Sequence, residues 1–173
     1  PNEPDGIFME PPRPRCYEQL IKKGCDNLGI PVIPSRLSII TEPLDGRAAC
    51  HYCAQCNRGC ATASNFQSPT VLLPDAQATG NLTLITSAMA HEVTTDQEGR
   101  AAGVNYIDKN EGRQRHIKAD IVVLAASAIE SARILLNSSS SRFPNGLANS
   151  SGALGHYIMD TTGSAVSGIV PEM

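Results

Sequence analysis

The sequence lacks any apolar run close to the roughly 20 residues that a membrane-spanning helix requires. It also lacks a basic cluster: its 14 lysine and arginine residues are scattered, and 17 acidic residues give a formal net charge of -3. Proteins that bind nucleic acid usually carry a basic patch, so this composition argues against a nucleic-acid partner. We therefore expect a soluble protein without a membrane span, periplasmic or cytoplasmic, and the sequence leaves the compartment open.

Two further features are missing. There is no G-x-G-x-x-G fingerprint, which dinucleotide-binding folds place between their first strand and helix. His91, His116 and His156 have no partner at catalytic spacing, so we expect no catalytic residue in this chain. The chain starts at Pro1 without an initiator methionine and stops after an apolar, glycine-spaced stretch. We interpret it as an internal segment of something longer.

The first half of the chain predicts helices and loops. Residues 1–15 carry five prolines, which oppose helix and central strand and predict an extended arm or loop. Apolar side chains at helical spacing predict an amphipathic helix from residue 16 to residue 28, which Gly29 ends. Ser68 and Pro69 predict the start of a second helix, which Pro74 must bend or restart before Gly80.

The second half predicts strands and one more helix. Three β-prone segments separated by turn signals predict an antiparallel meander: residues 88–96, 99–108 and 113–119. The apolar run 121–126 predicts a strand buried on both faces of a parallel sheet. Ser127 and Glu130 match the S-x-x-E capping box and predict that this strand leads directly into a helix. Helical spacing then continues through Ile129, Ala132, Arg133 and Leu136.

The stretch CHYCAQCNRGC at residues 50–60 has the C-x2-C-x2-C-x3-C spacing with which bacterial ferredoxins hold an iron-sulfur cluster. One hypothesis is therefore an iron-sulfur electron-transfer protein with four ligands: Cys50, Cys53, Cys56 and Cys60. Ala61 replaces the proline that commonly follows the fourth ligand, and no second ligand run exists. We favour packed or partly disulfide-linked cysteines and expect no metal site.

The buried strand predicted at residues 121–126 would end in small residues, Ala125, Ala126 and Ser127, at a helix N-terminus. Doubly wound folds bind phosphate oxygens at such a place, although small residues also simply allow close packing. The order of segments resembles the glucose-methanol-choline (GMC) family of FAD-dependent oxidoreductases. The resemblance runs from about residue 50 to residue 160, through GNLTLITSAMAHEVTTDQEGRAAGVNYID, ADIVVLAASAIESARILLNS and FPNGLANSSGALGHYIMD.

The resemblance implies a function and a set of cofactor-binding residues. GMC members oxidise alcohols and sugars by hydride transfer to FAD. By position, the main chain at Ala90 corresponds to the family's contact with the adenine of FAD, and Ala125, Ala126 and Ser127 correspond to an Ala-Ala-Gly beside the cofactor. The implied partners are an alcohol or sugar substrate, the N- and C-terminal portions of the same enzyme, and an electron acceptor. The catalytic histidine would lie outside this chain, which alone would be inactive.

The predicted fold class is α/β, as part of a Rossmann-like FAD-binding domain with an antiparallel β-meander. We expect an arm and helix at residues 1–49, part of the FAD-binding domain at 50–137, and a loop with the start of a substrate domain at 138–173. A third hypothesis is a non-catalytic binding module on this fold. It is suggested by Ser127 in place of glycine and by the absence of a family lysine from residues 62–65.

Overall fold

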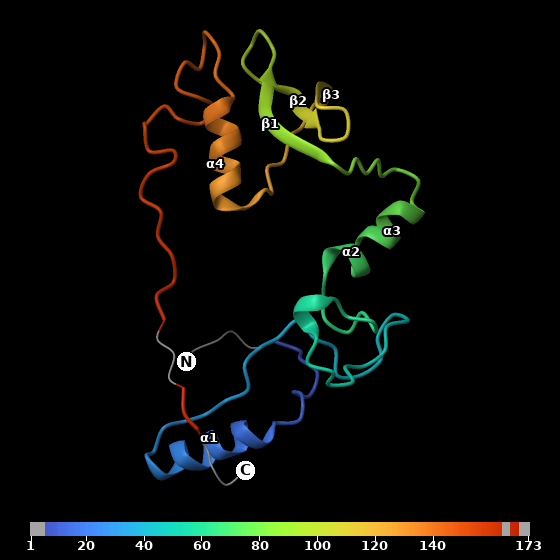
Figure 1. Ribbon diagram of the computed structural model, residues 1–173, viewed down its shortest axis with the longest axis vertical. Helices are drawn as coiled ribbons and strands as arrows, with labels where there is room; N and C mark the ends of the chain where they lie inside the picture. The colour runs from blue at the N-terminus through green and yellow to red at the C-terminus, as the bar shows by residue number, and fades with distance from the viewer. Residues whose placement is uncertain (1–5, 164–166, 170–173) are drawn as a thin grey trace. The chain divides into compact units, whose positions relative to one another are not determined.

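A computed structural model describes residues 6–163 and 167–169 of the chain (Figure 1). The chain divides into two compact units, Pro1–Thr83 and Leu84–Met173. This division falls inside the segment 50–137 that the sequence assigns to one domain, and the three-part organisation therefore stays a prediction. Among the described residues, no helix combines the length and the apolar character that a membrane crossing needs.

The first unit contains two of the predicted helices. Helix α1 spans Cys16–Asn27 and begins where the backbone N–H of Arg15 donates to Glu18 Oε2 at 2.6 Å. It ends before Gly29, whose φ of +68° lies in the left-handed region that favours glycine. The predicted helix is confirmed, and residues 6–15 form neither helix nor strand, as their prolines predict.

The second predicted helix is confirmed in two pieces. Helix α2 spans Ser68–Val71 with Pro69 in its first turn, and α3 spans Leu73–Ala78 with Pro74 in its first turn. Each proline lies in the first turn of a helix, where a backbone N–H would have no acceptor within the helix. Pro74 therefore begins a new helix instead of interrupting one. A single 3-10 turn, η1, spans Cys56–Arg58.

Backbone hydrogen bonds between loops hold the rest of the first unit together. The N–H of Ile40 donates to the Ser64 carbonyl at 3.0 Å, and the N–H of Cys50 donates to the Ile40 carbonyl at 3.1 Å. Phe66 N–H donates to the Ser38 carbonyl at 2.8 Å. Ile40 and Ser64 are buried. These bonds fix both ends of the cysteine-rich segment against residues 38–40.

The second unit contains the predicted meander, a three-stranded antiparallel sheet in the order β1-β2-β3. Its strands are β1 (Ala88–Thr95), β2 (Ala101–Asp108) and β3 (Arg113–Lys118). Ala90 pairs with Tyr106 while Glu92 pairs with Asn105, so His91 is an extra residue on β1. This β-bulge changes the direction in which the neighbouring side chains point.

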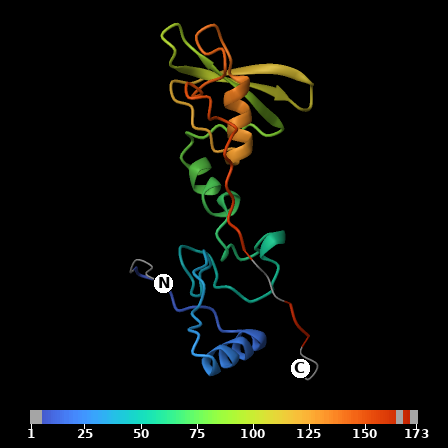
Figure 2. The ribbon, with the colours of Figure 1, turned by 90° about the vertical axis from the view of Figure 1, so that its left-hand side faces the viewer.

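Helix α4 spans Ser127–Asn137 and packs against β1 (Figure 2). Ile134 of α4 is 3% exposed and Val93 of β1 is 6% exposed, and together they form the apolar core of this unit. The buried hydroxyl of Ser138 accepts a hydrogen bond from the Val93 N–H at 2.8 Å and donates to the Ile134 carbonyl at 2.6 Å. The end of the helix is thereby tied to the middle of β1.

The predicted buried strand at residues 121–126 is wrong for this structure. The segment forms no strand, and Ile121 and Val123 are each 81% exposed. A parallel strand needs a hydrogen-bonded neighbour on the sheet, and within residues 6–163 and 167–169 no segment pairs with it. The α/β content and the antiparallel sheet are confirmed, whereas the apolar run lacks the partner that would make it a strand.

The predicted capping box is also wrong. Ala126 occupies the N-cap position, no side chain caps the helix, and Ser127 is already its first residue. A capping side chain must precede the first helical residue, so Ser127 lies one position too late. Glu130 instead accepts a hydrogen bond from Arg133 Nε at 2.9 Å.

Candidate functional site

The second unit contains every residue that the sequence predicts to bind the cofactor. Ala90 lies in the middle of β1, is partly buried, and its carbonyl accepts a hydrogen bond from Arg133 Nη2 at 3.0 Å. Arg133 belongs to α4. The backbone at Ala90 is therefore held in place by a side chain of the helix whose start carries the other candidate residues.

Ala125, Ala126 and Ser127 lie at that start and are all exposed. Arg133 lies six residues beyond Ser127, which corresponds to about 9 Å of rise along a helix. Helix α4 thus connects the two parts of the candidate site within one unit. The small, exposed side chains at positions 125 and 126 leave the backbone open to a large ligand.

Ser127 adopts φ of +67°, the left-handed region in which any residue with a Cβ is strained. The resemblance to the GMC family implies glycine at this position. The structure supplies a physical reason for that glycine, because the backbone keeps the conformation that glycine tolerates best.

Ser127→Gly is expected to stabilise the protein by about 1 kcal/mol. Glycine removes the left-handed strain, and this gain is larger than the cost of the additional backbone entropy that glycine has in the unfolded chain. Ser131→Gly, inside the same helix, is the matched control and should destabilise by about 0.5 kcal/mol through lower helix propensity. Urea unfolding of both variants measures the difference. A destabilising Ser127→Gly change would contradict the assigned strain.

His91, which the sequence marks only as a histidine without a partner at catalytic spacing, has unusual surroundings in the structure. Its Nε2 is buried and has no hydrogen-bond partner among the described residues. Buried polar atoms without partners are rare in folded proteins. Since His91 forms the bulge directly after Ala90, this unpartnered atom belongs to the residue next to the predicted adenine contact.

The other two histidines of this unit have different surroundings. His116 Nε2 lies 3.1 Å from the hydroxyl of Thr94 across the sheet. The ring of His156 lies 6.0 Å, centroid to centroid, from that of Tyr157. Neither contact is a hydrogen bond to a carboxylate, the partner that orients many catalytic histidines.

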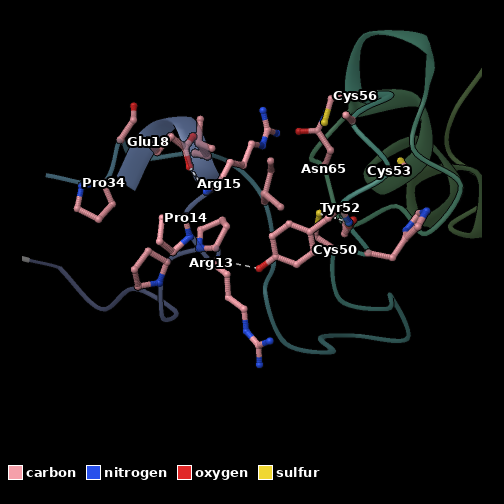
Figure 3. A pocket seen from close by; sticks show the side chains of 18 of the residues that line it. Arg13, Pro14, Arg15, Glu18, Pro34, Cys50, Tyr52, Cys53, Cys56 and Asn65 are labelled. Carbon is pink, nitrogen blue, oxygen red and sulfur yellow. Dashed lines mark hydrogen bonds between the residues drawn. The ribbon is translucent and has the colours of Figure 1, made fainter. Parts of the chain in front are cut away.

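The first unit contains a cavity of about 540 Å³ (Figure 3). Its walls come from the proline-rich arm, the start of α1, the segment 32–39 and the cysteine-rich segment. The arm is held there by the backbone N–H of Arg13, which donates to Tyr52 Oη at 2.9 Å. Most of the lining is apolar, with Arg13, Arg15 and Lys22 as its cations and Glu18 as its acid. The sequence did not predict this cavity.

Cys60 lines that cavity beside several polar groups. Its sulfur accepts a hydrogen bond from the Asn65 N–H at 3.4 Å and lies 3.2 Å from the Ser64 hydroxyl and 3.5 Å from the Thr62 hydroxyl. These donors, the Asn65 N–H above all, lower the pKa of the Cys60 thiol to about 6. Cys60 is thus the thiol of this chain that the surrounding structure favours as a thiolate at neutral pH.

The alkylation of Cys60 by iodoacetamide is expected to rise with pH to a plateau, with its midpoint near pH 6, whereas an ordinary thiol titrates near pH ~8.5. The folded state favours the thiolate, so this group's contribution to stability is fully present above the unfolded pKa and is lost as the pH falls through the folded one. Peptide mass spectrometry measures the rate at each pH. The double variant Thr62→Val, Ser64→Ala should move the midpoint upward, and an unchanged midpoint would contradict the role of these hydroxyls.

The four cysteines of the run are not arranged as a metal centre. All six cysteines of the chain are free thiols. In the part of the chain that the structure describes, no group of three or more histidine, cysteine or acidic side chains is placed to hold a metal ion. No observation therefore favours the iron-sulfur hypothesis over packed cysteines, and no disulfide joins them here.

Comparison with known proteins agrees with the resemblance. The model of the GMC oxidoreductase family matches residues 7–156. The chain therefore belongs to the GMC oxidoreductase family. It is 36% identical over 162 residues to a 2-methyl-1,2-propanediol dehydrogenase from Mycolicibacterium austroafricanum, a match that covers 92% of this chain and 29% of the relative.

Two further relatives match over a similar span. A paromamine 6'-oxidase from Streptomyces fradiae is 30% identical over 91% of this chain and 29% of its own length. The large subunit of a fructose dehydrogenase from Gluconobacter japonicus is 27% identical over 88% of this chain and 27% of its own length. The chain thus spans less than a third of the curated relatives that it matches.

Proposed function

We propose that this chain is part of an FAD-dependent oxidoreductase that oxidises an alcohol or sugar hydroxyl, and that it binds the adenine and pyrophosphate portion of FAD. The observation that carries the proposal is the family match over residues 7–156. The relatives are named as a dehydrogenase of 2-methyl-1,2-propanediol, an oxidase of paromamine and a dehydrogenase of fructose. We assign the corresponding class of hydroxyl compounds to this protein.

The residues of the second unit fit FAD. Exposed alanines at positions 125 and 126 leave room for a bulky ligand beside the backbone, and the first N–H groups of α4 have no intrahelical acceptor, which favours phosphate oxygens. The unpartnered Nε2 of His91 adds a polar atom next to Ala90. These features support a Rossmann-like FAD-binding domain, to which residues 50–137 would contribute.

These residues would have different roles in holding FAD. Arg133 holds the carbonyl of Ala90 at 3.0 Å and so fixes the strand on which an adenine would lie. Ala126 and Ser127 offer backbone to the pyrophosphate. FAD, when bound, supplies the hydride acceptor. A histidine outside this chain would accept the hydroxyl proton, and the chain alone would have no activity.

The test uses the whole protein from which this chain comes. It should be purified with FAD, identified by mass after denaturation, and its flavin absorption should bleach anaerobically when a diol or sugar is added. Ala126→Glu places a negative charge where the pyrophosphate would lie, and we expect it to raise the FAD dissociation constant at least tenfold, or about 1.4 kcal/mol. Flavin fluorescence on release measures this change independently of turnover.

Ala153→Glu is the matched control, since Ala153 is exposed in a loop of the same unit. It should leave the dissociation constant unchanged. A whole protein that binds no flavin would contradict the proposal. Tight binding of FAD with no bleaching by any hydroxyl compound would instead support the non-catalytic binding module.

A further inference from the structure

Four of the chain's six thiols line the cavity of the first unit. Cys50, Cys53, Cys56 and Cys60 all line it, although they come from a loop, the 3-10 turn η1 and the residues that follow it. Figure 3 shows Cys50, Cys53 and Cys56 across the pocket from Pro14 and Pro34. The remaining cysteines, Cys16 and Cys25 of α1, are not part of the lining. A small reagent that enters the cavity therefore has access to thiols from four positions of the cysteine-rich segment.

We propose that this cavity is a thiol-redox site, in which Cys60 is oxidised by a small hydroperoxide and then forms a disulfide with one of the other three cysteines of the cavity. The proposal does not depend on the proposed function. It assigns a chemical role to a cavity that lies outside the candidate FAD-binding residues.

The surroundings of Cys60 select it as the attacking thiol. Its sulfur lies within hydrogen-bonding distance of one backbone N–H and two hydroxyls, all of which can donate to a thiolate. Ser64 is 2% exposed, and its hydroxyl lies 2.9 Å from that of Thr62, so one hydroxyl can donate to the other while the second donates to the sulfur. A thiolate that lines an open cavity is the form that attacks peroxides.

The other three cysteines are suited to the second step. Cys50 and Cys53 lie in loop, and Cys56 begins a single turn of 3-10 helix. The Cys50 N–H is bonded to the Ile40 carbonyl, but the segment between its fixed ends contains no regular element besides η1, so a local opening can bring a second sulfur to Cys60 without unfolding a helix or sheet.

The two steps balance. The Cys60 thiolate attacks one oxygen of the hydroperoxide, an S–O bond forms and the O–O bond breaks. The sulfur loses two electrons and becomes a sulfenic acid, and the other oxygen leaves as hydroxide or alkoxide and takes up a proton. A second thiol then attacks this sulfur, an S–S bond forms and the S–O bond breaks, and water leaves.

The test uses the whole protein, reduced and then treated with one equivalent of hydrogen peroxide at pH 6.5. Its iron content is measured first, because iron bound through these cysteines would overturn the proposal. Peptide mapping should find Cys60 joined to Cys50, Cys53 or Cys56, and dimedone added with the peroxide should label Cys60. Cys60→Ser should abolish both signals, whereas Cys16→Ser, on the exposed face of α1, should change neither.

A second variant keeps the proposal testable if Cys60→Ser does not fold. Thr62→Val, Ser64→Ala keeps the thiol and removes two donors, and it should slow the labelling of Cys60 severalfold. The proposal is overturned if dimedone labels the exposed Cys16 faster than Cys60. A disulfide from Cys60 to Cys16, to Cys25 or to another molecule would overturn it as well.

Discussion

Ile134→Ala is expected to destabilise the protein by about 3 kcal/mol, the cost of deleting a buried isoleucine side chain and leaving a cavity. Ile134 is 3% exposed and packs on the face of α4 that contacts β1. The described core of this unit is small, with Val93 as its other buried apolar residue. Few neighbours are therefore available to refill the lost volume.

Ile129→Ala is the matched control, because Ile129 lies on the same helix and is 67% exposed. It removes the same atoms and should change the free energy of unfolding by less than about 0.5 kcal/mol. Urea unfolding followed by circular dichroism measures both variants. Equal effects of the two substitutions would show that α4 packs through a different face.

Gly146→Ala should cost about 3 kcal/mol for a different reason. Gly146 has φ of +91°, and a Cβ there would lie 2.7 Å from the Leu135 carbonyl oxygen and 2.8 Å from the Leu136 Cα. Both neighbours are backbone atoms at the end of α4, so they move only if the helix end moves. The left-handed strain of about 1 kcal/mol therefore adds to a steric overlap of about 2 kcal/mol.

Gly152→Ala separates these two contributions. Gly152 has φ of +71°, but a Cβ there would have no neighbour within 4 Å. Its substitution should cost about 1 kcal/mol, from backbone strain alone. The difference of about 2 kcal/mol between the two variants, measured by thermal unfolding, reports how closely residues 143–147 fold back onto α4. No difference would mean that this contact is absent.

Local patterns predicted most of the secondary structure. The meander follows from β-prone segments and turn residues that are close in sequence, and α1 follows from its own periodicity and from Gly29. Pro74 restarts a helix as proline chemistry requires. Each of these features depends on neighbours within a few residues, which a single sequence contains.

The predictions that failed concern features that depend on residues far away in the sequence. The run 121–126 looks like a strand in sequence but has no paired neighbour among the described residues. Helical spacing alone did not identify the buried face of α4: Ile129 and Leu136 are exposed, whereas Ile134 is buried, because β1 decides which face is covered. The sequence did not predict the hydrogen bonds around the Cys60 sulfur or the lack of a partner for His91 Nε2.

The sequence named the residues of the candidate site but not their geometry. Ala90, Ala125, Ala126 and Ser127 were named from resemblance, and their role in binding FAD stays a proposal. The positive φ of Ser127 and the bond from Arg133 to Ala90 could not be predicted, because both arise from the packing of α4 against the sheet.

The exposed run at residues 121–126 has a consequence for handling the protein. IVVLAA contains no charge, no proline and several β-branched residues, and Ile121 and Val123 are open to solvent. Such six-residue segments stack readily into intermolecular β-structure. This chain in isolation should therefore precipitate at high concentration, and a charged substitution such as Val123→Lys would make it easier to keep in solution.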